Sequence, residues 1–227
     1  PPTLTNGNVH GIIVLNVYNE RLLRLLAETQ IPKVFLDTSS LVAPDELNGD
    51  LLLMESRTSV RRITCHLLEQ GRTLPGFIGD ISYAQSNRER YEGFCQALAD
   101  AGKKVDSSLC LTTPLGIDTY REEIDTFLSS LSRMPDAFVC ASDYVACILM
   151  QLLEKRGLRV PEDVAVSGFD NNTEDLLAEH LTTVQVFNEE LGARLALQIL
   201  YRIKYPNTPH EITYLGTNVL YRDSTGD

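Results

Sequence analysis

Short apolar runs alternate with amphipathic stretches along almost the whole chain. Apolar runs of strand length occupy residues 11–15, 32–36, 51–54, 76–79, 108–112, 137–141, 164–166 and 211–219. Stretches with helical spacing of apolar residues lie at 20–29, 60–70, 86–101, 120–131, 143–156 and 191–203. Strands that alternate with helices of this length are typical of βαβ units. The pattern therefore predicts an α/β fold built on parallel sheets.

Polar residues stand where several of these strands end. The run at 164–166 gives way to Ser167-Gly168-Phe169-Asp170, and Asp37 follows the run at 32–36. The carboxyl ends of parallel strands are where open α/β sheets bind ligands. A structural alternative stays open for Asp170, since Asn171 and Asn172 follow and an Asx turn would use its carboxylate.

The helix expected at 86–101 has a recognisable start. Ser86 and Glu89 have the spacing of a capping box, in which each side chain bonds the backbone of the other. Arg90 then falls in the first turns, where a cation is mildly unfavourable. Arg90 is either a solvated side chain tolerated at small cost or a donor directed at a ligand.

Composition narrows the class of protein. The net charge of -11 argues against nucleic-acid binding by this segment alone, because phosphate binding needs a basic surface. No apolar run has the length of a membrane span, and no signal peptide is visible. The chain begins Pro1-Pro2-Thr3, which favours a fragment or a processed product. The five cysteines have no CxxC spacing and favour reduced thiols in a cytoplasmic protein over a disulfide framework or zinc site.

The common catalytic and cofactor motifs are absent from the sequence. It has no GxGxxG, P-loop, GxSxG or HExxH pattern, and the four histidines have no ligand-like spacing. We therefore expect no enzyme, no metal site and no cofactor.

An ordered set of segments resembles the effector-binding part of LacI/GalR-type bacterial transcription regulators. The segments are Asn8-Val9-His10-Gly11-Ile12-Ile13-Val14, Ile31-Pro32-Lys33-Val34-Phe35-Leu36-Asp37, residues 66–79, the Ser86…Arg90…Gly93-Phe94 helix, residues 136–143, residues 160–192 with Leu181-Thr182-Thr183-Val184, and Tyr221-Arg222-Asp223-Ser224-Thr225. They follow the family's order and cover nearly the whole chain. The resemblance is not complete, since His10 stands where the family usually has Asp and Arg72 where it has His.

The resemblance implies two Rossmann-like lobes of the periplasmic-binding-protein type I fold, joined by three chain crossings. On this expectation residues 1–54 with 186–212 form an N-terminal lobe, and residues 55–185 with 213–227 form a C-terminal lobe. The N-terminal lobe is expected to be truncated, and the family's DNA-binding domain to be absent from this chain.

The same resemblance implies a set of ligand contacts. It assigns ligand binding to Asp37, Arg90, Ser142, Asp143 and Asp170, and adds Asn16, Tyr83 and Tyr120 as further candidates. Asp143 also suits the start of a helix, where it would act as a cap. Paired carboxylates and one Arg suit the hydroxyls of a neutral sugar. Val186, where the family often has a polar residue, and Pro114, near its aromatic stacking position, depart from the pattern.

The implied function is an effector-sensing module, most simply for a sugar, in a cytoplasmic, homodimeric transcriptional repressor. Effector binding between the lobes would change their arrangement and the affinity for operator DNA. Three alternatives stay open: a periplasmic sugar-binding protein of a transport system, an enzyme on a Rossmann-like fold, and the same sensor joined to another DNA-binding domain.

Overall fold

The computed structural model describes residues 7–116, 118–172 and 179–227. The chain divides into two compact units. The first consists of Pro1–Glu55, Tyr83–Ser86 and Phe187–Gly216, and the second of Ser56–Ser82, Asn87–Val186 and Thr217–Asp227. Residues 1–6 of the expected N-terminal lobe lie outside the described residues. Residues 213–216 belong to the first unit rather than to the second, because they extend the sheet of the first unit.

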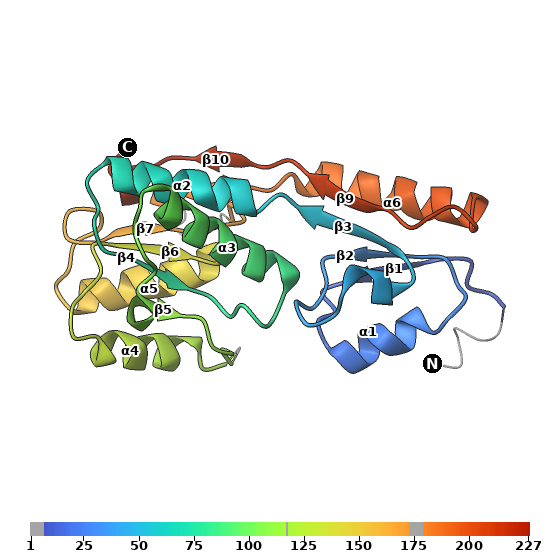
Figure 1. Cartoon of the computed structure of the whole chain (residues 1–227), viewed down its shortest axis with the longest axis horizontal. Helices are drawn as coiled ribbons and strands as arrows, with labels where there is room; N and C mark the ends of the chain where they lie inside the picture. Colours follow the sequence, from blue (N-terminus) through green and yellow to red (C-terminus); the bar gives the residue numbers. More distant parts are fainter. Residues whose placement is uncertain (1–6, 117, 173–178) are drawn as a thin grey trace. The chain divides into compact units, whose positions relative to one another are not determined.

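The first unit is built on a four-stranded parallel sheet with the order β1-β2-β3-β9. The strands are Ile12–Leu15, Lys33–Leu36, Asp50–Met54 and Ile212–Leu215. Helix α1 (Glu20–Ala27) and the short 3-10 helix η2 (Pro44–Leu47) lie on one face, and α6 (Asn188–Lys204) lies on the other (Figure 1). Val14, Phe35, Leu51 and Leu53 pack with Leu23 of α1 to form the core on the α1 face.

The second unit has a four-stranded parallel sheet with the order β5-β4-β6-β7. Its strands are β4 (Pro75–Ile78), β5 (Cys110–Leu111), β6 (Ala137–Cys140) and β7 (Ala165–Ser167). Its helices are α2 (Arg57–Glu69), α3 (Gln85–Asp100), which begins in the first unit, α4 (Tyr120–Ser130) and α5 (Asp143–Lys155). Two further strands, β8 (Thr183–Gln185) and β10 (Asn218–Leu220), pair antiparallel.

Neighbouring residues of β4 face opposite layers of the second unit, as the strand period of two requires. The ring of Phe77 contacts Tyr91 and Phe94 of α3, at centroid distances of 5.1 and 5.6 Å. Ile78 packs instead with the buried apolar residues of α4 and α5. The sheet is thus covered on both faces, which explains its continuous apolar strands. The predicted α/β class with parallel sheets is confirmed.

Three local predictions were wrong. Helix α3 begins at Gln85, one residue before the expected start, so Ser86 lies inside the helix, where its hydroxyl donates to Asp37. The strand expected at 211–219 is two strands, β9 and β10, which pair in different sheets. The strand expected at 108–112 is only Cys110–Leu111, preceded by a 3-10 turn, η3 (Ser107–Leu109). The split at 211–219 follows from long-range pairing, since β9 pairs with β3 and β10 pairs with β8.

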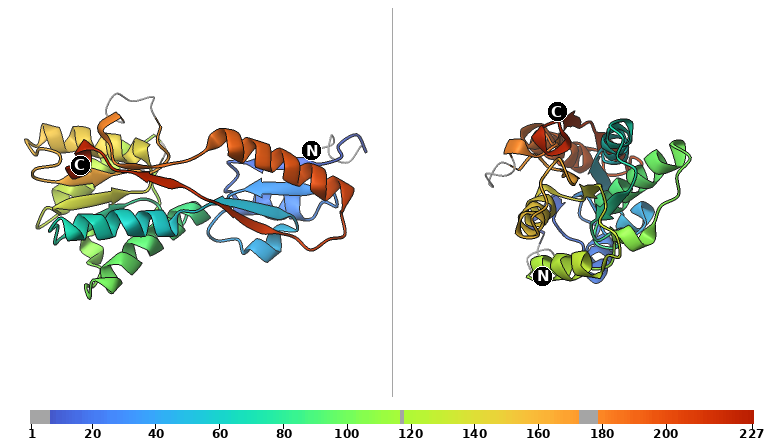
Figure 2. Two further views of the ribbon diagram at one scale, coloured as in Figure 1. Left: turned by 90° about the horizontal axis from the view of Figure 1, so that it is seen from above. Right: turned by 90° about the vertical axis from the view of Figure 1, so that its left-hand side faces the viewer.

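No helix in the described part of the chain combines the length and the apolar composition needed to cross a bilayer. Figure 2 shows the two sheets and their helices from two further directions.

Candidate functional site

The carboxyl edge of the second unit's sheet brings together three of the predicted ligand-binding positions. Ser142 and Asp143 follow β6, and Asp170 follows β7, its neighbour in the sheet. Arg90 reaches the same edge from α3, because its guanidinium donates to the carbonyl of Ala141. Because β6 and β7 are neighbouring parallel strands, the loops that follow them lie side by side.

Arg90 is a buried cation with unused hydrogen-bonding capacity. The residue is 4% exposed, and its guanidinium carbon lies 3.6 Å from the centre of the Phe169 ring. Its Nη2 is 3.6 Å from Oδ1 of Asp170. The Nε is buried and donates to no acceptor among the described residues. A buried donor without a partner costs about 1–3 kcal/mol.

Asp170 has an unusual backbone dihedral angle and a partly exposed carboxylate. Its φ is 114°, which a residue with a Cβ rarely adopts, and its side chain is 43% exposed. Desolvation by the surrounding protein raises the pKa of this carboxyl, and the nearby charge of Arg90 opposes the rise. A carboxylate fixed in this way can accept from two neighbouring hydroxyl groups of a ligand.

Ser142 and Asp143 are held by contacts within the protein. Ser142 is the N-cap of α5, and its Oγ accepts from the N–H of Val145 at 3.3 Å. Asp143 is 2% exposed, and its two oxygens accept from the Thr183 hydroxyl at 2.6 Å and the Asn172 N–H at 2.8 Å. Desolvation raises the pKa of Asp143 to about 6, against the opposing hydrogen bonds from Thr183 and Asn172.

The raised pKa of Asp143 makes the stability of the chain depend on pH. An acid that holds its proton more tightly in the folded chain contributes stability below about pH 4 and loses it as the pH rises through about 6. Asp143→Asn cannot titrate. Between pH 4 and pH 7 we expect the wild type to lose about 2–3 kcal/mol relative to Asp143→Asn. Urea unfolding at both pH values measures this, and a difference that does not change with pH would contradict the assignment.

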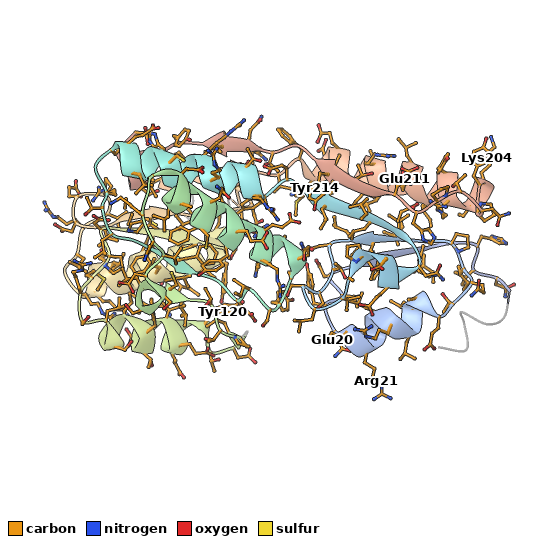
Figure 3. The ribbon with its side chains drawn as sticks, viewed as in Figure 1. Glu20, Arg21, Tyr120, Lys204, Glu211 and Tyr214 are labelled. Atoms are coloured by element: carbon orange, nitrogen blue, oxygen red, sulfur yellow. The ribbon has the colours of Figure 1, made fainter. Side chains whose placement is uncertain are left out.

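An aromatic pair stands at the same end of the sheet. Tyr120 lies in the first turn of α4 (Figure 3), and its ring is 5.8 Å from that of Tyr144 in the first turn of α5, edge to face. Tyr144 is 59% exposed. The sequence offered Tyr120 as a candidate but gave no reason to pair it with Tyr144, since the contact joins two helices.

The first unit carries the remaining predicted residues. Asn16 and Asp37 directly follow the adjacent parallel strands β1 and β2, with φ of 54° and 59°. Asn16 is exposed, whereas Asp37 is 5% exposed and accepts from the hydroxyl of Ser86 at 2.6 Å. Tyr83 is 45% exposed, and its ring is 4.4 Å from that of Tyr18.

Two residues that the sequence did not propose for the site, Arg222 and Gln185, bond the side chain of Asn171 at the same edge of the sheet. The Nη2 of Arg222 donates to Oδ1 of Asn171 at 2.8 Å, and the Nδ2 of Asn171 donates to Oε1 of Gln185 at 2.6 Å. Arg222 lies within one of the segments that carry the resemblance, and that was the only available signal of its role.

The described ranges also contain side chains of the kinds that bind metal ions or react as thiols. They contain no group of three or more His, Cys, Asp or Glu residues able to hold a metal ion. The five cysteines are free, and two of them, Cys140 and Cys147, are buried. Burial raises the pKa of Cys110 to about 11 and holds the thiol protonated at neutral pH.

Comparisons with known proteins agree with this architecture. A family described as periplasmic binding protein-like domain matches residues 64–225. The HTH-type transcriptional repressor PurR of Aliivibrio fischeri is 29% identical over 225 residues, which are 97% of this chain and 66% of that protein. The HTH-type transcriptional regulator DegA of Bacillus subtilis is 31% identical over 170 residues, which are 74% of this chain and 48% of that protein.

A solved structure of a transcriptional regulator also resembles this chain. The complex of the transcriptional regulator CelR with cellobiose is 27% identical and superimposes with a TM-score of 0.86, covering 98% of this chain and 68% of that one. The family match extends over well more than half of the chain, and these three relatives are transcriptional regulators. The chain belongs to the periplasmic binding protein-like domain family, in the form found in transcriptional regulators of the LacI/GalR type.

Proposed function

We propose that this chain is the effector-sensing part of a DNA-binding transcriptional regulator and that its effector is a neutral sugar. The observation that carries the proposal is the pairing of Arg90, a buried cation with an unpartnered Nε, with the half-open carboxylate of Asp170. Together they offer a fixed donor and a fixed acceptor at the carboxyl edge of a parallel sheet.

The chemistry of this pair suits a polyol better than a charged ligand. Asp170 can accept from two adjacent hydroxyls, and the free Nε of Arg90 can donate to a ring or hydroxyl oxygen. A phosphorylated ligand would need cations that are not already engaged, whereas Asp170 offsets the charge of Arg90, and Arg222 donates to Asn171 and to the carbonyl of Leu181. The relative CelR was solved with cellobiose, which supports the sugar class.

Asp37, Asn16 and Tyr83 remain candidate contacts in the first unit, and Tyr120 with Tyr144 offers an aromatic surface in the second. Ser142 and Asp143 are weaker candidates for direct contact, because their oxygens already accept hydrogen bonds from the protein.

Effector binding regulates DNA affinity if the sugar binds one conformation of the full-length regulator better than the other. We propose that the regulator works in the cytoplasm as a homodimer, binds operator DNA through a separate domain and catalyses no reaction. The relatives described above are regulators, so a transport role is not favoured.

Replacing Asp170 by Ala tests the proposal. A thermal-shift panel of pentoses, hexoses and disaccharides, with cellobiose included and nucleobases as a second class, identifies the ligand of the wild type. Asp170→Ala should then weaken the binding of that sugar by about 1.5–3 kcal/mol, the value of a hydrogen bond to a charged group.

Asp100→Ala is the matched control, since Asp100 is an exposed carboxylate at the other end of α3, paired with Arg61. It should leave the affinity unchanged. Equal affinity of Asp170→Ala and wild type would remove Asp170 from the site. A nucleobase as the only ligand to raise the melting temperature would exclude the sugar class.

A further inference from the structure

The turn that carries Asp170 is held in an unusual conformation. Asp170 and Asn171 both have positive φ, at 114° and 52°, although neither is glycine. Backbone strain of this kind persists only where surrounding contacts fix it. The contacts that fix this turn therefore decide where the carboxylate of Asp170 lies.

The N–H of Asp170 donates to the carbonyl of Val184 at 3.1 Å, and the next two N–H groups of the turn donate to one hydroxyl and one carboxylate. The Thr183 hydroxyl accepts from the N–H of Asn171 at 3.3 Å and donates to Oδ1 of Asp143 at 2.6 Å. The other oxygen of Asp143 accepts from the N–H of Asn172 at 2.8 Å. Thr183 is fully buried and Asp143 is 2% exposed, so solvent does not compete for these bonds.

The same contacts attach the turn to the strands that connect the two units along the chain. Thr183 opens β8, and the chain passes into the first unit after Val186. It returns at Thr217 and forms β10, which pairs with β8. Just beyond β10, Arg222 donates to the side chain of Asn171 at 2.8 Å.

We infer that Thr183 and Asp143 are positioning residues of the effector site, which fix the turn that presents Asp170 and join it to strands β8 and β10. This inference rests on the proposed function. It explains why two threonines stand at the start of β8: Thr182 bonds Arg222 and Thr225, whereas Thr183 bonds the Asp170 turn.

The electrostatic surroundings of Asp143 allow the bond from Thr183 to be observed directly. Asp170 and the buried thiol of Cys140 lie close to Asp143, and Arg222 is the nearby cation. Asp170 raises the pKa of Asp143, whereas Arg222 and the bonds from Thr183 and Asn172 lower it. Removing the Thr183 hydroxyl should therefore raise the pKa of Asp143 further above about 6.

The test compares Thr183→Val, which keeps the branched shape without the hydroxyl, with Thr183→Ser, which restores the hydroxyl. In the full chain, NMR should show amide exchange at 170–172 at least tenfold faster in Thr183→Val, and a higher carboxyl pKa for Asp143. Thr183→Ser should restore both values. Thr64→Val is the control, because the buried Thr64 hydroxyl donates to the carbonyl of Val60 within α2.

Unchanged exchange and an unchanged Asp143 pKa in Thr183→Val would overturn the inference, as would failure of Thr183→Ser to restore them. If Thr183→Val does not fold, Asp143→Ala tests the inference instead. This variant removes the acceptor of the Asn172 N–H, so amide exchange at Asn172 should become faster. Titration calorimetry with cellobiose tests the effect on ligand binding. Thr183→Val should bind cellobiose at least tenfold more weakly than Thr183→Ser. Absence of cellobiose binding by the wild type would count against cellobiose as the effector, and the exchange result would still decide this inference.

Discussion

Arg202→Met should destabilise the chain by about 3–5 kcal/mol, because it would leave the buried carboxylate of Asp50 without its cation. Arg202 is 2% exposed and Asp50 fully buried. The guanidinium donates Nη2 to Oδ1 of Asp50 at 2.5 Å and Nε to Oδ2 at 3.0 Å. Its remaining donors bond the carbonyls of Thr208 and Pro209 at 2.6 and 2.9 Å.

The ion pair of Arg202 and Asp50 lies at the amino end of the first unit's sheet, where it joins α6 to β3. Asp50 opens β3, Arg202 lies in the last turns of α6, and the segment bonded to Arg202 leads into β9. Although burial alone would raise the pKa of Asp50, hydrogen bonds from Arg202, Gln198 and the Glu211 N–H lower it. Loss of the cation removes the largest of these opposing effects.

Urea unfolding followed by circular dichroism measures the cost of Arg202→Met. The matched control is Arg24→Met, which breaks the exposed pair with Glu46 in the same unit and should cost less than about 1 kcal/mol. Adding Asp50→Leu to Arg202→Met should recover much of the loss, since the orphaned charge is then gone. Equal effects of Arg202→Met and Arg24→Met would show that Asp50 is stabilised by its other donors.

The sequence predicted those features of the fold that depend on local pattern. The alternation of apolar runs and amphipathic stretches predicted the α/β class and the parallel strands, whereas the division into two lobes came from the family resemblance. The change from apolar to polar residues also placed Asp37 and Asp170 close after strand ends. Arg90, left open between a solvated side chain and a ligand donor, proved to be buried beside Asp170.

Features that depend on contacts between distant segments could not be predicted. Asp143 looks like a helix cap or a ligand contact in the sequence, and only the hydroxyl of Thr183, 40 residues away, shows that its carboxylate is already engaged. The same holds for Arg202, whose partner Asp50 lies 152 positions away. Ser86 satisfied a local capping pattern, but the helix begins one residue earlier, at Gln85, and the hydroxyl of Ser86 donates to Asp37, 49 residues away.

Gly93→Ala should destabilise the second unit by about 3 kcal/mol or more, whereas Gly192→Ala should stabilise the chain by roughly 0.5–1 kcal/mol. Both glycines lie inside helices, α3 and α6, and both belong to segments that carry the family resemblance. A Cβ at Gly93 would stand 2.2 Å from the carbonyl oxygen of Arg57, so α2 and α3 would have to separate. At Gly192 nothing lies within 4 Å of the added Cβ, and only the helix propensity changes.

Thermal and urea unfolding of the two variants separate steric crowding from backbone entropy. In both helices the alanine lowers the conformational entropy of the unfolded chain by a similar amount, so a difference in stability reports on crowding. Gly93→Ser should be at least as destabilising as Gly93→Ala, since its side chain meets the same carbonyl. If both alanine variants were stabilising, α2 and α3 would have room to move apart, and Gly93 would not be required for their packing. Opposite signs would establish that one motif glycine is needed for close helix contact and the other is not.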